Sequence, residues 1–229
     1  MMTRLTKPIA LLTLVFFPLL TVSQSNSPQN PVEISGEPRH HPKFENEYVR
    51  IWDVTVPAGD TTLWHAHRND NVVVSFGDVN LRIETLGSDT VETEWKSGEV
   101  RFTKATYVHR AMNIGKTDFH NFTIELLKAP AGATLTKEPG REPVIDNERV
   151  RVFRVSLAPG QSGPMHTHTV PVMAIALTAA DLELTTKGKD KPERVSRPMG
   201  NVLWRSEPVT HSVKNVGKTN YEGVDIEFK

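Results

Sequence analysis

The sequence contains no cysteine among its 229 residues, so the protein can form neither a disulfide bond nor a cysteine-linked lipid anchor. It also lacks an excess of charge of either sign, because 27 Lys and Arg residues balance 27 Asp and Glu residues. A nucleic-acid-binding surface needs clustered basic residues, and the chain shows no such cluster. We therefore expect no nucleic-acid partner.

Apolar runs long enough to span a membrane are missing as well. The longest, residues 9–20, is interrupted by Pro18, and a spanning helix needs about 20 apolar residues. This run follows a basic start with Arg4 and Lys7 and precedes small and polar residues, which is the pattern of a cleaved secretory signal peptide. We expect a signal peptide over residues 1–24, a secreted or periplasmic protein, and no membrane span after cleavage.

The segment that follows the predicted signal peptide is rich in Ser, Asn, Gln and Pro. This composition is typical of disorder, so we predict a disordered leader over residues 25–37. The remaining chain is long enough for one large domain or for two domains of about 100 residues.

An internal repeat decides between these two options. Shifted by 101 positions, residues 46–67 align with residues 147–168 and match at eight of 22 positions. Shifted by 102, residues 98–125 align with residues 200–227 and match at nine of 28. Self-similarity at one long spacing indicates a duplicated domain.

Each copy is rich in strand signals. Short segments such as YVRIWDVTV and HNFTIELL carry β-branched and aromatic residues, and Gly, Pro, Asn and Asp separate them. We expect an all-β protein of antiparallel sandwiches or barrels, with packing between the two copies as a source of stability. The predicted domains are residues 38–128 and 144–229, joined by a linker over residues 129–143 that contains Pro and Gly.

Six of the nine histidines occupy equivalent positions in the two copies. Each copy has a His-x-His pair and a third histidine about forty residues later. Residues two apart in a strand point to the same side, so the pair can hold one metal ion and the third histidine can complete the ligand set. A lone histidine is more often a hydrogen-bonded core residue, but two complete sets favour metal binding. The predicted ligands are His65, His67 and His109 in the first copy and His166, His168 and His211 in the second.

The residues around these histidines resemble the two motifs of the cupin superfamily. In GDTTLWHAH and GQSGPMHTH, a glycine and five further residues precede His-x-His. In GEVRFTKATYVHRAMN and GNVLWRSEPVTHSVKN, a glycine is followed by a histidine and then by an asparagine. The resemblance covers the chain from about residue 38 to its end. It implies two tandem cupin (jelly-roll type) antiparallel β-barrels, a bicupin, with a metal in each mouth. It does not select an activity, because the family includes both enzymes and binding proteins.

The sequence departs from the family pattern after each His-x-His pair, where the family usually has a glutamate ligand. The first copy has Asp70 and Asn71 there, whereas the second has Val172 and Met173. A carboxylate beside the metal can tighten binding or accept a proton. We therefore predict Asp70 and Asn71 as catalytic residues, and we expect the second pocket to be drier and secondary, or a binding site.

Three neutral imidazoles leave a divalent ion with its full charge and with open positions. Such a centre favours anionic or chelating ligands and acidifies bound water. We expect one divalent transition metal per site (Zn, Fe, Mn, Cu or Ni) and a metal-dependent enzyme, either dioxygenase-like or using Lewis-acid chemistry. Its substrate would be a small anionic or chelating organic molecule. The alternative is a non-catalytic protein that binds a metal or a small ligand, and a homodimer is left open.

Several remaining residues are assigned structural roles. His40, His41 and His120 fall outside the repeated set, and we predict surface or strand-edge positions for them. The second cupin motif departs from the family pattern, because Thr106 and Pro208 replace a glycine in the two copies. The repeated acidic and basic residues are predicted to be partners within the sheets; they are Arg50, Arg151, Glu125 and Glu227.

Overall fold

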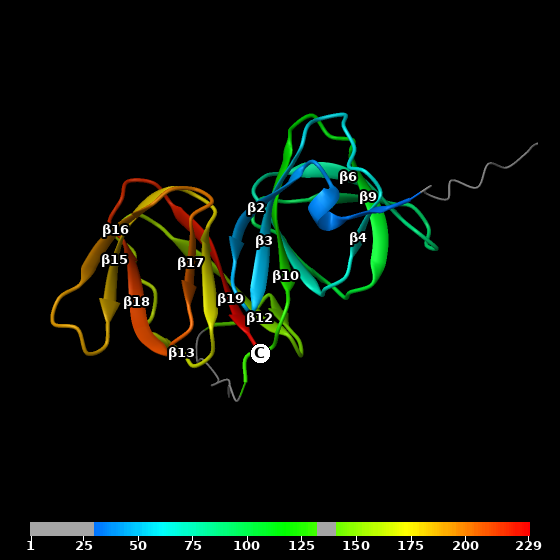
Figure 1. The fold of residues 1–229 in the computed structure, drawn as a ribbon. Helices are drawn as coiled ribbons and strands as arrows, with labels where there is room; N and C mark the ends of the chain where they lie inside the picture. Colours follow the sequence, from blue (N-terminus) through cyan, green and yellow to red (C-terminus); the bar gives the residue numbers. More distant parts are fainter. Residues whose placement is uncertain (1–29, 132–140) are drawn as a thin grey trace, which may run out of the picture.

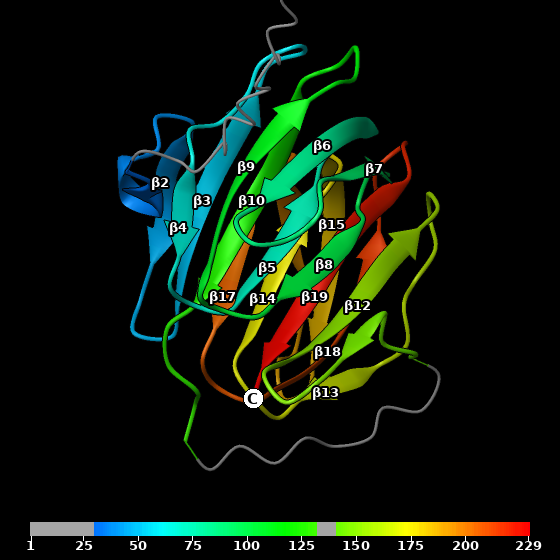
Figure 2. The ribbon, with the colours of Figure 1, turned by 90° about the vertical axis from the view of Figure 1, so that its right-hand side faces the viewer.

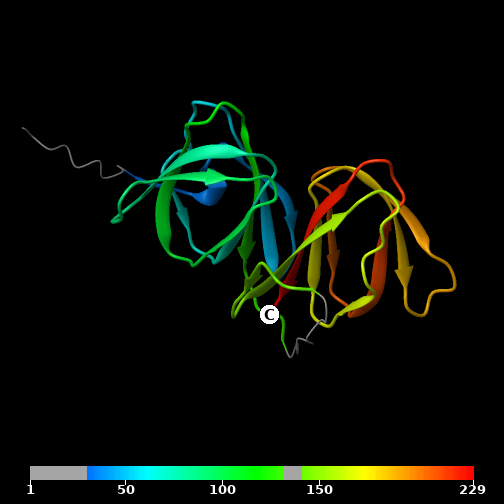
Figure 3. The same cartoon turned by 180° about the vertical axis from the view of Figure 1, so that it is seen from behind.

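The computed structural model describes residues 30–131 and 141–229, and nearly every element within these ranges is a β-strand. The named strands pair only within the N-terminal half (30–131) or within the C-terminal half (141–229), so the sequence repeat is also a structural repeat. The two halves lie side by side (Figures 1 and 3). The predicted signal peptide and most of the predicted linker fall outside the described residues. No helix within the described ranges has the length and apolar character needed to cross a membrane.

The N-terminal half consists of two five-stranded sheets, with strand orders β1-β4-β9-β6-β7 and β2-β3-β10-β5-β8. All neighbouring strands are antiparallel except β1 and β4, which are parallel. The bounds are β1 Val32–Glu33, β2 His40–Glu45, β3 Val49–Val56, β4 His65–His67, β5 Asn71–Ser75, β6 Val79–Thr85, β7 Val91–Trp95, β8 Val100–Thr103, β9 Tyr107–Asn113 and β10 Phe119–Leu126, with a short 3-10 helix η1 at Ile34–Gly36.

The C-terminal half repeats this plan with sheets ordered β11-β12-β19-β14-β17 and β13-β18-β15-β16. In neither half does the strand order close into a ring, so each barrel is an open pair of sheets, as in a jelly roll. The bounds are β11 Ile145–Asp146, β12 Val150–Leu157, β13 His166–His168, β14 Val172–Ala176, β15 Ala180–Thr186, β16 Glu193–Arg197, β17 Val202–Arg205, β18 Val209–Asn215 and β19 Tyr221–Phe228.

The largest apolar core lies between the two halves. On β3, Val49 and Ile51 point to this shared core, while Trp52 and Val54 belong to the separate core inside the N-terminal half. The alternation follows from the two-residue period of a strand. Figure 2 views the molecule along this stacking direction, with the N-terminal sheets in front of the C-terminal ones. The shared core confirms the expected packing between the copies; its fully buried members include Val72, Val74, Phe122, Ile124, Val150, Val152, Met173, Ile175 and Ile226.

The repeated glycines and asparagines build matching turns rather than a binding site. Gly59 and Gly160 have φ angles of 78° and 79°, in the left-handed region that favours glycine. Their N–H groups donate to the carbonyls of Asn113 and Asn215, respectively, at 2.9 and 2.8 Å. Each of these asparagines also donates through its side chain across the GKT turn that follows it. These contacts explain why the motif residues recur in both copies.

The prediction of disorder over residues 25–37 is wrong for its last part. Residues 32–33 form β1, which runs parallel to β4, and residues 34–36 form η1. Ile34 is buried in the N-terminal core, and the carboxylate of Glu37 is buried below it. The contact of Ile34 with the N-terminal core holds this segment in place, and the polar composition of the segment does not reveal that contact.

Candidate metal centre

Strand register brings the predicted ligands together in both halves. His65 and His67 lie two apart on β4, and His109 on β9 is the direct cross-strand partner of His65. In each group of three, the candidate ligand nitrogens all lie within 4.8 Å of one another. The C-terminal half repeats the arrangement with His166 and His168 on β13 and His211, the partner of His166, on β18.

The hydrogen bonds of the C-terminal group leave two lone pairs facing each other. His166 Nδ1 lies 3.0 Å from the carbonyl oxygen of Pro164, which can only accept, so this nitrogen carries the proton. His168 Nδ1 lies 2.7 Å from a carboxylate oxygen of Glu227 and must likewise donate. The two Nε2 atoms therefore carry lone pairs, yet they are only 3.1 Å apart. Such an arrangement is repulsive without a cation between the nitrogens. Both ring nitrogens of His211 are also buried, with no hydrogen-bond partner among the residues that the structure describes.

The N-terminal group shows the same convergence. His65 Nδ1 donates to the carbonyl of Leu63 at 2.9 Å, which leaves a lone pair on Nε2. His109 Nε2 lies 3.0 Å from that atom and 3.1 Å from His67 Nε2. Metal–nitrogen bonds of about 2.0–2.1 Å meeting near a right angle place two ligand nitrogens about 3 Å apart. Both groups therefore fit one divalent ion each.

Burial keeps His65, His109 and His211 neutral, which is the form that binds metals. Burial, together with the nearby His40, lowers the pKa of His65 to about 4. Burial and the neighbouring histidines lower the pKa of His211 to about 3 and hold the pKa of His109 well below its ordinary value. A buried uncharged imidazole cannot repel an incoming cation, so the low pKa values support the ligand assignment.

His40 also belongs to the N-terminal site. It begins the edge strand β2, in line with the predicted strand-edge position, but the prediction of a surface position is wrong. The residue is 7% exposed, and its ring centroid lies 4.8 Å from that of His65. His40 Nδ1 lies 2.7 Å from Glu37. Although burial raises the pKa of Glu37, hydrogen bonds from His40 and from two backbone N–H groups lower it to about 2. His41, by contrast, is exposed as predicted.

The structure does not bring Asp70 into the histidine group. One of its carboxylate oxygens accepts from the backbone N–H of Ala105, and the other pairs with Arg149 of the C-terminal half at 2.8 Å. Asp70 therefore ties the two halves together. Asn71 is fully buried and bonds the hydroxyl of Tyr107, whose ring stacks on His67 at 4.6 Å. Asn71 thus touches the site only through Tyr107.

The carboxylate that contacts a ligand histidine is Glu227 on β19, a role that sequence reasoning missed. Besides His168, it accepts from Arg151 Nε at 2.7 Å, so the predicted pairing of these repeated residues within the sheet is confirmed. Although burial raises the pKa of Glu227, the bonds from His168 and Arg151 lower it, so the residue stays ionised. In the N-terminal half, the equivalent Glu125 accepts instead from Trp52 Nε1 at 2.8 Å.

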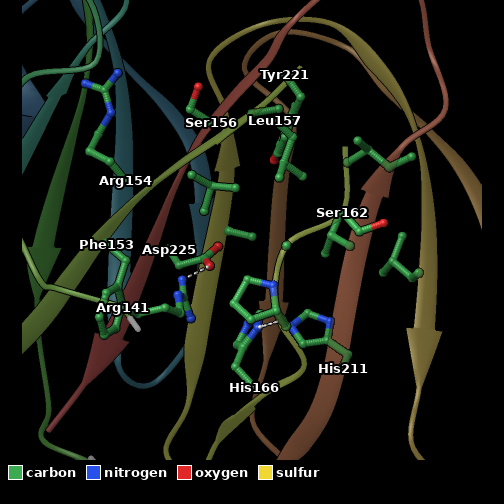
Figure 4. A pocket seen from close by; sticks show the side chains of 18 of the residues that line it. Arg141, Phe153, Arg154, Ser156, Leu157, Ser162, His166, His211, Tyr221 and Asp225 are labelled. Carbon is green, nitrogen blue, oxygen red and sulfur yellow. Dashed lines mark hydrogen bonds and ion pairs between the residues drawn. The ribbon is translucent and has the colours of Figure 1, made fainter. Parts of the chain in front are cut away.

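The cavities beside the two groups differ in size and lining. The N-terminal cavity measures about 70 Å³ and is lined largely by apolar side chains, among them Val54, Leu81 and Phe119. The C-terminal cavity measures about 320 Å³ and also contains Arg141 and Asp225, which pair at 2.8 Å near His166 (Figure 4). The expectation of a drier second pocket is therefore wrong. The error arose because the polar groups come from parts of the chain far from the His-x-His motif: Arg141 precedes β11, and Asp225 lies on β19.

No protein-family model matches the sequence, and no curated protein matches it. Solved structures do match the fold. The crystal structure of AerE from Microcystis aeruginosa aligns at a TM-score of 0.58 and 11% identity, over 84% of this chain and 98% of that chain. A variant of oxalate decarboxylase from Bacillus subtilis aligns at 0.57 and 11% identity, over 85% of this chain and 76% of that chain.

A third match is the Cupin 2 conserved barrel domain protein from Leptotrichia buccalis, at a TM-score of 0.50 and 11% identity over 82% of this chain and 88% of that chain. At these identities the matches establish the fold alone. Together with the two histidine groups and their motifs, they show that this chain has the cupin fold twice in tandem, as a bicupin.

Proposed function

We propose that the protein is an exported, metal-dependent bicupin enzyme that acts on a small anionic or chelating organic molecule in its C-terminal cavity. The observation that carries this proposal is the larger cavity of about 320 Å³, which joins His166 and His211 to three arginines: Arg141, Arg154 and Arg197. Ligand pockets typically begin near 300 Å³, whereas the N-terminal cavity of about 70 Å³ has room for little more than water.

Charge favours an anion in this cavity. Three neutral imidazoles add no negative charge to a divalent ion, so an ion held there keeps its attraction for a carboxylate or a chelating oxygen. When bound, the metal would supply Lewis-acid chemistry by polarising a ligand oxygen. Glu227 would hold the ring of His168, and Arg141 would fix the position of Asp225 beside His166.

Two further lines support the proposal. Oxalate decarboxylase from Bacillus subtilis, which shares this fold, has Mn(II) centres, so a divalent metal is consistent with the fold. The N-terminal pattern of basic, apolar and small residues supports export. We assign the N-terminal histidines to a second metal site in a confined, apolar setting, with no ligand-sized space beside it.

The proposal is tested by metal analysis of protein purified from its own compartment. We expect one to two equivalents of a transition metal, and the paired substitution His166→Ala with His168→Ala should remove the C-terminal share. The matched pair His65→Ala with His67→Ala should remove the N-terminal share. Turnover of a carboxylate substrate is measured as oxygen uptake and carbon dioxide release. It should disappear in the His166→Ala, His168→Ala variant and remain in the His65→Ala, His67→Ala variant. Full metal retention in both variants would refute the metal sites, and carboxylate binding without turnover would favour a binding protein.

A further inference from the structure

The C-terminal cavity extends far beyond its histidines. Arg197, the last residue of β16, pairs with Ala180 at one end of β15, whereas His211 pairs with Thr186 at the other end. Ala180 and Thr186 are six residue steps apart on β15, which corresponds to about 20 Å along the strand. Arg197 and His211 nevertheless line the same cavity, so it runs between them. Figure 4 shows Tyr221 at the opposite end of the view from His166 and His211.

The guanidinium of Arg197 places a positive charge at this far end of the cavity. Its one side-chain hydrogen bond within the described residues goes to the amide oxygen of Asn201, at 2.7 Å. In the same part of the chain, no carboxylate forms an ion pair with it, and Glu193 acts on it only at longer range. Arg197 is half-buried, and this burial lowers its pKa. A guanidinium in this setting can still offer several N–H donors to a planar anion.

Tyr221 adds a hydroxyl at the same end. Burial and Asp225 raise the pKa of Tyr221, so the phenol stays protonated and can donate. Its hydroxyl lies over Gly223, where a Cβ atom would come within 2.6 Å of the phenolic oxygen. The glycine therefore provides the space that the phenol occupies. No residue in the described ranges accepts a hydrogen bond from this hydroxyl.

The N-terminal half shows that the fold does not require these polar groups. Trp95 ends β7 as Arg197 ends β16, and Phe119 begins β10 as Tyr221 begins β19. The Trp95 and Phe119 rings pack with centroids 5.8 Å apart and help to fill the small cavity. The second copy thus has a cation and a hydroxyl where the first has an apolar plug.

We infer that Arg197 and Tyr221 form a carboxylate subsite for an elongated dianionic ligand, such as an aliphatic dicarboxylate, whose other end reaches His166 and His211. The inference rests on the proposed function, because it places the ligand in the same cavity. One end offers a guanidinium with no carboxylate paired to it in the described residues and a phenolic donor, and the other end offers a cation-binding group, so the cavity selects a molecule with an anionic group at each end. The apolar lining between them, including Leu157, Leu182 and Leu184, suits a hydrocarbon spacer.

Calorimetric titration of the metal-loaded, full-length mature protein tests this inference. The probes are straight-chain dicarboxylates of four to eight carbons and the monocarboxylates of the same lengths. We expect at least one dicarboxylate to bind about tenfold or more tightly than its matched monocarboxylate. Arg197→Gln should remove that preference, and Tyr221→Phe should weaken it several-fold. Arg194→Gln makes the same charge change on an exposed residue of the same strand and should leave it intact.

Each outcome decides the question. Equal binding of mono- and dicarboxylates by the wild-type protein would overturn the inference, as would an unchanged preference in Arg197→Gln. If Arg197→Gln fails to fold, as judged by circular dichroism, the selectivity of Tyr221→Phe decides in its place. Loss of metal from the wild-type protein would refute the proposed function, whereas full metal content without dicarboxylate binding would refute only the subsite.

Discussion

The two halves place the same glutamate at equivalent strand positions but give it different partners. In the C-terminal half, Glu227 bonds the ligand histidine His168. In the N-terminal half, Glu125 bonds Trp52 and Asn69, and the buried Nδ1 of His67 has no hydrogen-bond partner in the described part of the chain. The histidine groups are alike, yet only one has a carboxylate that orients a ligand ring.

Two donors that the C-terminal half lacks at these positions, Trp52 and Asn69, explain this difference. A buried indole N–H requires an acceptor, and Trp52 takes Glu125 for that purpose. The equivalent residue in the other half is Phe153, which has no donor, so Glu227 is free to turn to His168. Asn69 also donates to the other carboxylate oxygen of Glu125, at 3.0 Å, whereas the apolar Val170 stands at its place in the C-terminal half. A duplicated metal motif can therefore keep all its ligands while exchanges at neighbouring positions change what supports them.

Low pH should produce the largest difference between the two histidine groups, seen in the stability of the metal-free protein. In protein stripped of metal, the free energy of unfolding should fall below about pH 6.5, because unfolded histidines take up protons that the folded ones exclude. Each such histidine contributes about 1.4 kcal/mol per pH unit down to its folded pKa. Burial lowers the pKa of His67 much further than that of His166.

His67→Gln should therefore flatten the pH dependence of the free energy of unfolding from about pH 6.5 down to about pH 4. His166→Gln should flatten it only over the upper part of this pH range. Denaturant unfolding between pH 7 and pH 4 measures both, with the exposed His41→Gln as the control. Equal flattening by the two variants would contradict the deeper burial of the N-terminal group.

Removing the supporting carboxylate should have a smaller effect that is confined to one site. Glu227→Gln should weaken metal binding by the C-terminal histidines about 10- to 100-fold, since a partner of this kind fixes the ring and its tautomer. Glu125→Gln should change the N-terminal affinity by less than about threefold, because Glu125 bonds no histidine within the described ranges. Zn²⁺ competition with a chelator measures each affinity in protein whose other histidine group has been replaced by alanine. A larger loss in Glu125→Gln would refute this account of the difference.

The smallest expected effect concerns a loop that differs between the halves. Thr106 has a φ of 70°, in the left-handed region that is costly for a β-branched residue, whereas Pro208 occupies the equivalent position in the C-terminal half. Thr106→Gly should raise the free energy of unfolding by about 1 kcal/mol, because glycine adopts this conformation without strain. Thr106→Ala keeps the strain and should give little gain in a thermal melt. A destabilised glycine variant would show that the threonine side chain compensates for its backbone.

The repeat, the all-β fold and the meeting of the six histidines were predictable from the sequence because they depend on local rules. His-x-His on a strand sets two rings on one face, and the equal spacing of the third histidine in both copies indicates a shared register. The remainder of the sites depends on contacts between distant strands. Glu37 follows β1 and η1, and its carboxylate bonds His40 and the backbone N–H of Leu63. The parallel pairing of β1 with β4 places Glu37 there, and no periodicity in the sequence indicates this pairing.

The assignment of Asp70 shows the limit of motif alignment. It stands after His-x-His, where the family usually has a glutamate ligand, but the neighbouring half supplies Arg149, which holds the carboxylate outside the site. A better signal lay in the differences between the copies. The repeat aligns Trp95 with Arg197, and a charge that replaces an apolar core residue in only one copy indicates a polar cavity there.

The shared core between the halves has a symmetry that bears on assembly. Its buried residues occur in equivalent pairs, such as Val49 with Val150, Ile51 with Val152 and Ile124 with Ile226. The same patch of each copy therefore faces its twin, which is the isologous contact of a twofold dimer, here contained in one chain. Covalent linkage keeps the effective concentration of the partner high whatever the protein concentration. Each chain thus brings two non-identical pockets into every assembly, and any further self-association must use a different surface.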